Sequence, residues 1–233
     1  MTSATEIIAH DSNTTTTNTI VNNTQDDDKD NVGRKRPKTI KKEKNKKVEQ
    51  HILKSSYFGN DNSLANDNDN DDSFIEIGID EAGRGPMFGR VYIGAVVLPK
   101  DSKQFDFSKM KDSKKFHSDK KIKEAAEYIK SHAIAWSVIY AEHDEIDEKN
   151  IRKATIDCMH KAVNDIMEKM NQTPDKLYLL VDGNDFIPMM KLCDDSYIQI
   201  PHKCIESGDN TYASIAAASI LAKVTRDEYI IEM

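Results

Sequence analysis

The chain has 233 residues, a formal net charge of −7 at pH 7 and three cysteines without CxxC spacing. This length suits one or two domains, and the odd number of scattered cysteines argues against a disulfide framework and against a zinc site. No apolar run approaches the ~18 residues of a membrane span, and no signal-peptide core follows Met1. We therefore expect an intracellular protein that works without a membrane.

Composition changes sharply near Ser73. Residues 1–72 are rich in Asn, Asp, Thr and Lys, and cannot bury enough apolar surface to offset the entropy of the chain. We predict a disordered N-terminal extension over 1–72 and a folded domain over 73–233. The extension holds a basic block, Arg34–Lys47, and an acidic, polar block, Asn60–Asp72. The basic block is either a solvated tail, a sequence-independent phosphate contact or a nuclear-localisation signal, so we expect a cytoplasmic or a nuclear protein.

The folded domain begins with two predicted strands. FIEIGID (Phe74–Asp80) alternates apolar and polar residues, whereas RVYIGAVVL (Arg90–Leu98) is largely apolar, which is typical of a more buried strand. EAGRGPMFG, between them, has the glycines and the proline of a turn. Ser118–Ser131 has helical spacing, with Ser118 as the candidate N-cap. AIAWSVIYA (Ala133–Ala141) has the composition of a third strand.

The second half of the domain alternates helices and strands. Glu148–Met170 carries apolar residues at helical spacing. KLYLLVD (Lys176–Asp182) is a short hydrophobic strand that ends in a DGND turn, and SYIQIP (Ser196–Pro201) is the candidate edge strand. Asn210–Ile231 has the last helical pattern. This order predicts an α/β fold with a mixed sheet flanked by helices.

Three acidic residues stand where predicted strands end. Asp80 and Glu81 close the first strand before a glycine-rich turn, and Asp182 closes an apolar strand before Gly183. Adjacent side chains on an ideal strand point to opposite faces, so Asp80 and Glu81 can meet only where the strand ends or bulges. The glycines permit this departure. The carboxyl ends of strands are also where ligand crevices form in α/β folds.

Asp227 lies in the last predicted helix. Val224, Ile220 and Ala216 stand three, seven and eleven residues before it and share its helix face. Because much of that face is apolar, we expect Asp227 to point toward the sheet. The small residues of ASIAAASILA (213–222) would let the helix approach the sheet closely.

Four converging carboxylates would repel one another strongly unless cations neutralised them. Hard oxygen ligands suit Mg²⁺ or Mn²⁺. Two such ions about 4 Å apart can activate a water and stabilise the leaving oxygen in phosphodiester hydrolysis. Taken singly, each of these aspartates is more often a turn-former, a cap or a surface residue, so spacing alone leaves both interpretations open.

Five blocks of the folded domain resemble type 2 ribonuclease H, the ribonuclease HII family, and occur in that family's order. They are IGIDEAGRGPMFGRVYIGAVVL (Ile77–Leu98), KDSKKF (Lys111–Phe116), EIDEKNIRKATIDCMHKAV (Glu145–Val163), LLVDGND (Leu179–Asp185) and SIAAASILAKVTRD (Ser214–Asp227). The resemblance covers most of residues 74–233. It implies the ribonuclease H-like fold, a mixed five-stranded sheet with helices on both sides.

The resemblance also implies an activity. We expect an endonuclease that hydrolyses the RNA strand of RNA/DNA hybrids and cuts duplex DNA on the 5′ side of embedded ribonucleotides. A two-metal-ion reaction with Mg²⁺ or Mn²⁺ would leave 5′-phosphate and 3′-hydroxyl ends. The partner would be nucleic acid, the protein a monomer, and the setting DNA replication or ribonucleotide excision repair.

The implied catalytic residues, which would also hold the metal ions, are Asp80, Glu81, Asp182 and Asp227. The resemblance further implies that the backbone of Gly83, Arg84 and Gly85 contacts the 2′-hydroxyl group that distinguishes RNA from DNA. It suggests phosphate contacts for Lys114 and Lys115. The alternatives are an ordinary tight loop for the glycine-rich turn and a solvated loop for the lysines.

The family pattern normally continues past the Arg-Asp pair into a helix and a Pro-Gly-Tyr-Gly segment, whose tyrosine stacks near the ribonucleotide. Because this chain stops at Met233, we expect a domain truncated at its C-terminus. The alternative function is therefore a non-catalytic module that binds RNA/DNA hybrids. A Holliday-junction resolvase or an integrase of the same fold is a third possibility, against which the GRG turn and the DSKK block argue.

Overall fold

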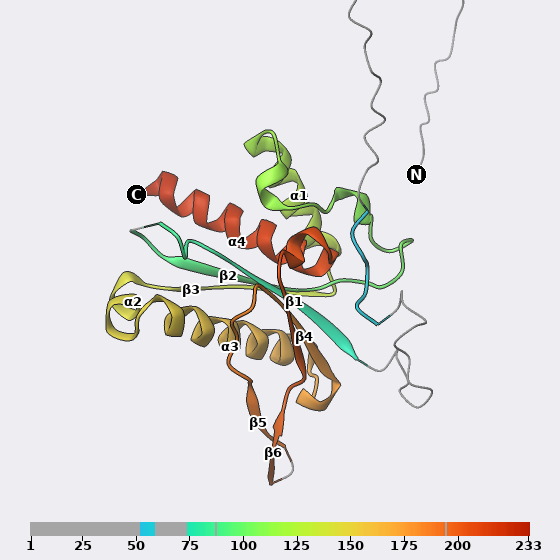
Figure 1. Ribbon diagram of the computed structural model, residues 1–233. Coiled ribbons are helices and arrows are strands. Elements are labelled where there is room, and N and C mark those ends of the chain that lie inside the picture. Colours follow the sequence, from blue (N-terminus) through green and yellow to red (C-terminus); the bar gives the residue numbers. More distant parts are fainter. Residues whose placement is uncertain (1–51, 59–73, 87, 194) are drawn as a thin grey trace, which may run out of the picture. The chain divides into compact units, whose positions relative to one another are not determined.

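The computed structural model describes residues 52–58, 74–86, 88–193 and 195–233. All of them belong to one compact unit, Glu49–Met233, shown in Figure 1. The basic and acidic blocks of the N-terminal extension lie outside the described residues. None of the described helices is long and apolar enough to cross a lipid bilayer.

A five-stranded mixed sheet with the strand order β3-β2-β1-β4-β7 forms the centre of the fold. The strands are β1 (Ile75–Ala82), β2 (Val91–Val97), β3 (Ala135–Ala141), β4 (Leu177–Asp182) and β7 (His202–Ile205). β1, β2 and β3 pair in antiparallel fashion, whereas β4 runs parallel to β1 and β7 runs parallel to β4. The carboxyl ends of β1, β4 and β7 therefore meet at one edge of the sheet.

Helices cover both faces of this sheet (Figure 1). On one face α4 (Ala213–Glu232) packs across β1 and β2, with α1 (Asp119–His132) beside it, and α3 (Ile151–Met170) covers the other face. Each face has its own buried apolar cluster. A Cβ atom added at Gly78 or Gly94 would lie 2.2 Å from the backbone of α4. The close approach predicted from the small residues of this helix is confirmed, and so is the α/β fold with a mixed five-stranded sheet.

The helix predicted over Glu148–Met170 corresponds to α3, and its first two residues belong to a separate short helix, α2 (His143–Lys149). Asn150 separates them with a φ of 69°, a value that interrupts the helical path. Its side-chain oxygen accepts a hydrogen bond from Lys153 N at 3.0 Å and so caps α3. Apolar spacing did not reveal the break, because one residue outside the helical region leaves the pattern on either side intact.

The predicted edge strand Ser196–Pro201 does not join the central sheet. Its residues form β6 (Ser196–Gln199), which pairs with β5 (Met190–Cys193) in a separate two-stranded hairpin. The sheet edge is β7, which follows immediately. β6 and β7 have four residues each, too few for the alternation of apolar and polar residues to show which of them joins the central sheet.

Part of the predicted disordered extension, Ile52–Phe58, packs against the folded domain. Lys54 forms a parallel bridge with Tyr212 just before α4. The buried carboxylate of Glu76 on β1 accepts hydrogen bonds from the hydroxyl of Ser56 and, at 2.8 Å, from Tyr57 N. The expected domain boundary is therefore corrected to include this short segment. Its few apolar residues were hidden by the polar composition around them.

Candidate active site

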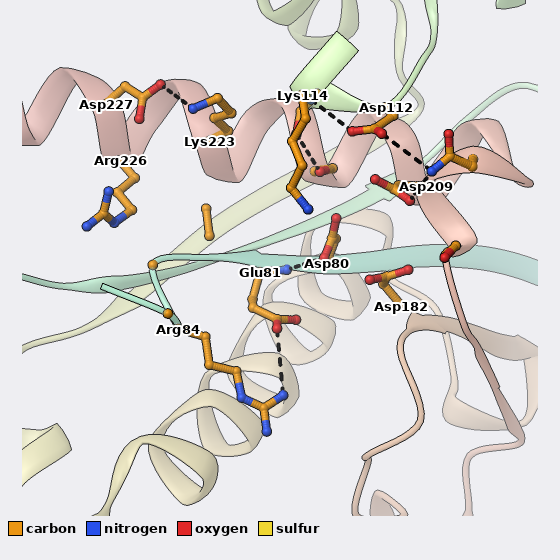
Figure 2. A pocket seen from close by; sticks show the side chains of 17 residues that line it. Asp80, Glu81, Arg84, Asp112, Lys114, Asp182, Asp209, Lys223, Arg226 and Asp227 are labelled. Carbon is orange, nitrogen blue, oxygen red and sulfur yellow. Dashed lines mark hydrogen bonds and ion pairs between the residues drawn. The ribbon is translucent and has the colours of Figure 1, made fainter. Parts of the chain in front are cut away.

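A cavity of about 540 Å³ opens at the sheet edge where β1 and β4 end. Asp80 and Glu81 reach it from β1, and Asp182 reaches it from the last position of β4. Asp209 reaches it from η5 (Gly208–Asn210), the short helix that follows β7. Figure 2 shows Asp80, Asp182 and Asp209 around a common space, with Glu81 beside them and turned toward Arg84. Strand direction explains their meeting, because β1, β4 and β7 are parallel.

Asp80 is the most enclosed of the four, with 6% of its surface exposed. Its Oδ1 accepts a hydrogen bond from Glu81 N at 2.7 Å, and the hydroxyl of Ser219 on α4 acts to lower the pKa of this carboxyl. Ser219 Oγ in turn lies 3.0 Å from Ser113 Oγ. Burial, then the negative charges of Asp182 and Glu81, raise the pKa of Asp80 well above its usual range. An uncompensated negative charge is therefore costly at this position.

Glu81 is partly neutralised by the GRG turn. Burial raises the pKa of Glu81, and the charge of Asp182 adds to this, whereas Arg84 lowers it. Arg84 Nη1 lies 3.7 Å from Glu81 Oε1, and its Nη2 lies 3.4 Å from Asp185 Oδ2. Asp185 is held by Arg152 of α3 through contacts of 2.6 and 2.8 Å. A chain of alternating charges thus fixes the turn after β1 to the turn after β4.

Asp182 and Asp209 are joined through the backbone of η5. Asp182 Oδ1 accepts a hydrogen bond from Gly208 N at 2.7 Å, which seats the short helix against the end of β4. Asp209 is only 8% exposed, and Asn210 Nδ2 donates to its Oδ1 at 3.1 Å. Burial, then the charges of Asp112 and Asp182, raise the pKa of Asp209. Asp209 is therefore linked to Asp80 and Glu81 through Asp182, whose charge raises the pKa of all three.

Asp209 and Asp112 were missed in the sequence, although a signal for Asp209 was present. The triplet Gly208-Asp209-Asn210 follows a strand that runs parallel to β4, so the strand-end argument that selected Asp182 applies to it as well. Placing the edge strand at Ser196–Pro201 hid that relation. Asp112 lines the cavity from the turn before η3 (Ser113–Lys115), where it caps the backbone of Lys114 at 2.8 Å.

Asp227 lines the same cavity but stands apart from the carboxylate cluster. Its side chain is 44% exposed and accepts a hydrogen bond from Lys223 Nζ at 2.8 Å. In Figure 2 it is on the far side of the cavity, turned toward that lysine. The helix face that carries Asp227 is buried at Val224, as expected. The last turns of α4, however, pack over the β1–β2 turn, beside Gly83 and Gly89, and not over the strand ends. The structure therefore does not bring Asp227 to the other acids.

All three residues of the GRG turn line the cavity. Gly83 has a φ of +102°, and a Cβ atom there would lie 2.5 Å from Arg226 Nε and 2.6 Å from Arg90 O. A side chain is therefore excluded at Gly83. Gly85 instead faces open space, because a Cβ atom added to it would have no neighbouring atom within 4 Å. Its backbone is open to close approach by a ligand.

The two lysines of the DSKK block differ in their surroundings. Lys114 lines the carboxylate cavity, and its charge lowers the pKa of Asp209. Lys115 is 60% exposed, lies 3.9 Å from Asp112 Oδ2 and contacts the side-chain oxygen of Asn210. Of the pair, only Lys114 is directed at the cavity.

The donor set fits a hard divalent cation. Carboxylate oxygens of Asp80, Glu81, Asp182 and Asp209 line one cavity, and their mutual repulsion is the condition that a bound Mg²⁺ or Mn²⁺ relieves. Among the described residues, no three such side chains already form a closed ligand group. Arg84, 3.7 Å from Glu81 Oε1, would share that carboxylate with a bound cation.

Comparisons with known proteins agree with this geometry. A family model for ribonuclease HII matches residues 77–233. The ribonuclease HII of Parabacteroides distasonis is 44% identical over 159 residues, 68% of this chain and 71% of the relative. That of Bacteroides thetaiotaomicron is 42% identical over 156 residues, 67% of this chain and 69% of the relative.

Solved structures show the same fold. The ribonuclease H2 from Pyrococcus horikoshii OT3 has a TM-score of 0.55 at 24% identity, covering 67% of this chain and 74% of that one. Bst-RNase HIII in complex with Mn²⁺ has a TM-score of 0.54 at 19% identity, covering 69% of this chain and 54% of that one. With the family model and the relatives in agreement, this chain belongs to the ribonuclease HII family of endonucleases that act on RNA/DNA hybrids.

Proposed function

We propose that this chain hydrolyses the RNA strand of RNA/DNA hybrids and cuts on the 5′ side of ribonucleotides embedded in duplex DNA, leaving 5′-phosphate and 3′-hydroxyl ends. The observation that carries the proposal is the meeting of Asp80, Glu81, Asp182 and Asp209 in one cavity. Folded residues 74–233, with the attached segment Ile52–Phe58, would form the catalytic domain.

These four carboxylates would hold two Mg²⁺ or Mn²⁺ ions. Bound there, the ions would supply an activated water and charge to stabilise the leaving oxygen. We assign Asp209, and not the Asp227 expected from the sequence, as the fourth metal ligand. Asp209 is buried and repelled by neighbouring carboxylates, whereas Asp227 is paired with Lys223. Ser219, whose hydroxyl acts on the pKa of Asp80, would help to orient that carboxylate.

The glycine-rich turn would provide the selection for RNA. The open backbone at Gly85 and the positive φ of Gly83 let the main chain lie close to a sugar. A backbone contact to the 2′-hydroxyl group distinguishes a ribonucleotide from a deoxyribonucleotide. Lys114, on the wall of the same cavity, would contact a phosphate near the bond that is cut.

The test is cleavage of matched duplexes by the full chain. An RNA/DNA hybrid and a DNA duplex with one ribonucleotide should be cut in the presence of Mg²⁺ or Mn²⁺, and an all-DNA duplex should not. Asp80→Asn and Asp182→Asn should abolish cutting without abolishing folding. Cleavage that persists in Asp80→Asn, or in excess chelator, would refute the mechanism.

End-group analysis of the products tests the chemistry separately. Labelled substrates should give 5′-phosphate and 3′-hydroxyl ends, and a 3′-phosphate would show a different reaction. Tight hybrid binding with no turnover across a full titration of both metals would instead support the non-catalytic binding module. Substrate preference between the hybrid and the single ribonucleotide then separates a role in primer removal from one in ribonucleotide repair.

A further inference from the structure

A second cavity, of about 370 Å³, lies beside the first, between η2 (Phe107–Lys109), η3 and α1. Lysines and aromatic rings dominate its lining. Three lysines, two aromatic residues and one acid line it: Lys109, Lys111, Lys121, Phe116, Tyr128 and Glu124. We call it the lysine groove.

The lysine groove belongs to a strongly basic stretch of an acidic protein. Residues 107–125 contain seven lysines and three acidic residues, although the whole chain has a net charge of −7. Lys120 and Lys123, on the exposed side of α1, pair with glutamates at 3.9 and 3.0 Å. Lys109, Lys111 and Lys121 form no ion pair with a carboxylate in the part of the chain that the structure describes. The groove lining therefore carries three lysines against one acid, Glu124, which leaves a net positive charge even with Asp106 near Lys109.

Two of these ammonium groups are held over aromatic rings. Lys109 Nζ lies 3.7 Å from the ring centroid of Tyr128, and Lys111 Nζ lies 4.3 Å from that of Phe116. The Tyr128 ring is itself fixed, because its hydroxyl accepts a hydrogen bond from Asp106 N at 2.8 Å. Cation–π contact positions an ammonium group while leaving its charge and its N–H donors available to a ligand.

The lysine groove continues the proposed substrate site. Lys111 lines the groove, and the next three residues, 112–114, line the carboxylate cavity. Three residues of extended chain span at most about 10 Å. A nucleic-acid strand carries one phosphate for about every 3.4 Å along the helix axis. The groove therefore lies within about three nucleotides of the carboxylate cavity.

We propose that the lysine groove binds the phosphodiester backbone of the duplex arm that leaves the active site, within about three nucleotides of the bond that is cut. This inference rests on the proposed function and adds a contact beyond the DSKK block. A polyanion approaching a cluster of acids on a net acidic protein is repelled, so a docked duplex needs positive charge next to the cluster. An acidic peptide would find the same charge, but the continuity with the carboxylate cavity favours nucleic acid.

Salt dependence of binding tests the inference. The groove variant, Lys109→Gln with Lys111→Gln and Lys121→Gln, should be compared with a control variant that loses the same charge elsewhere. The control substitutions are Lys176→Gln, Lys191→Gln and Lys203→Gln, around β4, the hairpin and β7. Hybrid binding is measured by fluorescence anisotropy in chelator, between 50 and 200 mM salt.

Each lost phosphate contact should reduce the slope of log K against log salt by about 0.9. We expect the groove variant to lose about two to three from this slope, and the control variant to keep the slope of the unmodified chain. In metal, the groove variant should show a raised KM and an unchanged kcat. A groove variant with the unmodified slope and KM would overturn the proposal.

A second measurement leaves the protein unmodified. Neutral methylphosphonate linkages placed within about three nucleotides of the cleavage position should weaken binding to the unmodified chain and should not weaken binding to the groove variant further. The same linkages far along the arm should have no effect. Equal effects at both positions would also overturn the proposal. Failure of the unmodified chain to cut hybrids would refute the proposed function, whereas the slope and linkage measurements judge the groove alone.

Discussion

Asparagine substitutions at Asp209 and Asp227, made one at a time, separate the acid that the structure places in the cluster from the acid that sequence reasoning placed there. Asparagine keeps the shape of the side chain and removes its charge. Asp209 is buried at 8% exposure among like charges. Asp227 is half-exposed and paired with Lys223 one helical turn away. The two substitutions should therefore differ in both activity and stability.

The expected magnitudes follow from these surroundings. An exposed pair four residues apart on a helix stabilises by about 0.3–0.5 kcal/mol, so Asp227→Asn should lower the free energy of unfolding by no more than this and change kcat by less than about twofold. Loss of a group that supports a metal ligand typically costs about 10–100-fold, so loss of a ligand itself should exceed about 100-fold. Asp209→Asn should therefore abolish most of the activity.

Single-turnover cleavage of an RNA/DNA hybrid across a Mn²⁺ titration measures this difference, with thermal unfolding in chelator as the second readout. Without metal, Asp209→Asn should unfold at the same or a higher temperature than the unmodified chain, because it relieves repulsion from Asp112 and Asp182. A low activity together with an undiminished melting temperature identifies a functional defect. The reasoning fails if Asp209→Asn keeps more than a tenth of the activity, or if Asp227→Asn loses as much.

Three further results are expected from the same geometry. Because folding raises the pKa of Asp80, the folded state binds more protons than the unfolded state. The contribution of Asp80 to metal-free stability should therefore be greatest below about pH 4 and should fall as the pH rises. In urea unfolding, the free energy of unfolding of Asp80→Asn should fall less over the same pH range. Gly94→Ala would place a Cβ atom 2.2 Å from Ala218 O and should cost at least about 1–3 kcal/mol in urea unfolding. Glu76→Gln should weaken the hydrogen bonds from Ser56 and Tyr57 N to this side chain, and each charge-assisted bond of this kind contributes about 1.5–3 kcal/mol. Amide hydrogen exchange should therefore become faster in residues 52–58 and stay unchanged in α3.

Strand-end reasoning located most of the acidic cluster from the sequence. The apolar runs that end at Asp80 and Asp182 had to be buried, and burial of a strand carries its last residue to the sheet edge. Their parallel pairing, with Ile79 beside Val181, puts both ends at the same level. The second strand, β2, and the cap at Ser118 were also predicted, because both depend on local pattern.

The remaining features depend on distant contacts that a local pattern does not contain. Asp209 enters the cluster because Gly208 N binds Asp182 across the parallel pair β4–β7, and a four-residue strand gives too little alternation to reveal that pair. The segment Ile52–Phe58 is ordered by Glu76, whose place on the sheet is known only once β1 is assembled. The spacing of apolar residues in α4 correctly predicted that one face of the helix is buried. It did not predict which part of the sheet that face covers.

The close packing of α4 connects the fold to the site. Gly78 and Gly94 let the helix backbone lie directly on β1 and β2, and this approach sets Ser219 against Asp80. The same packing fixes the position of the first turn of α4, and with it the position of the short helix η5 that carries Asp209. Small residues on the helix and glycines on the strands thus determine how closely the acids meet. That spacing makes the cluster unfavourable without cations, and the same spacing would let it bind them.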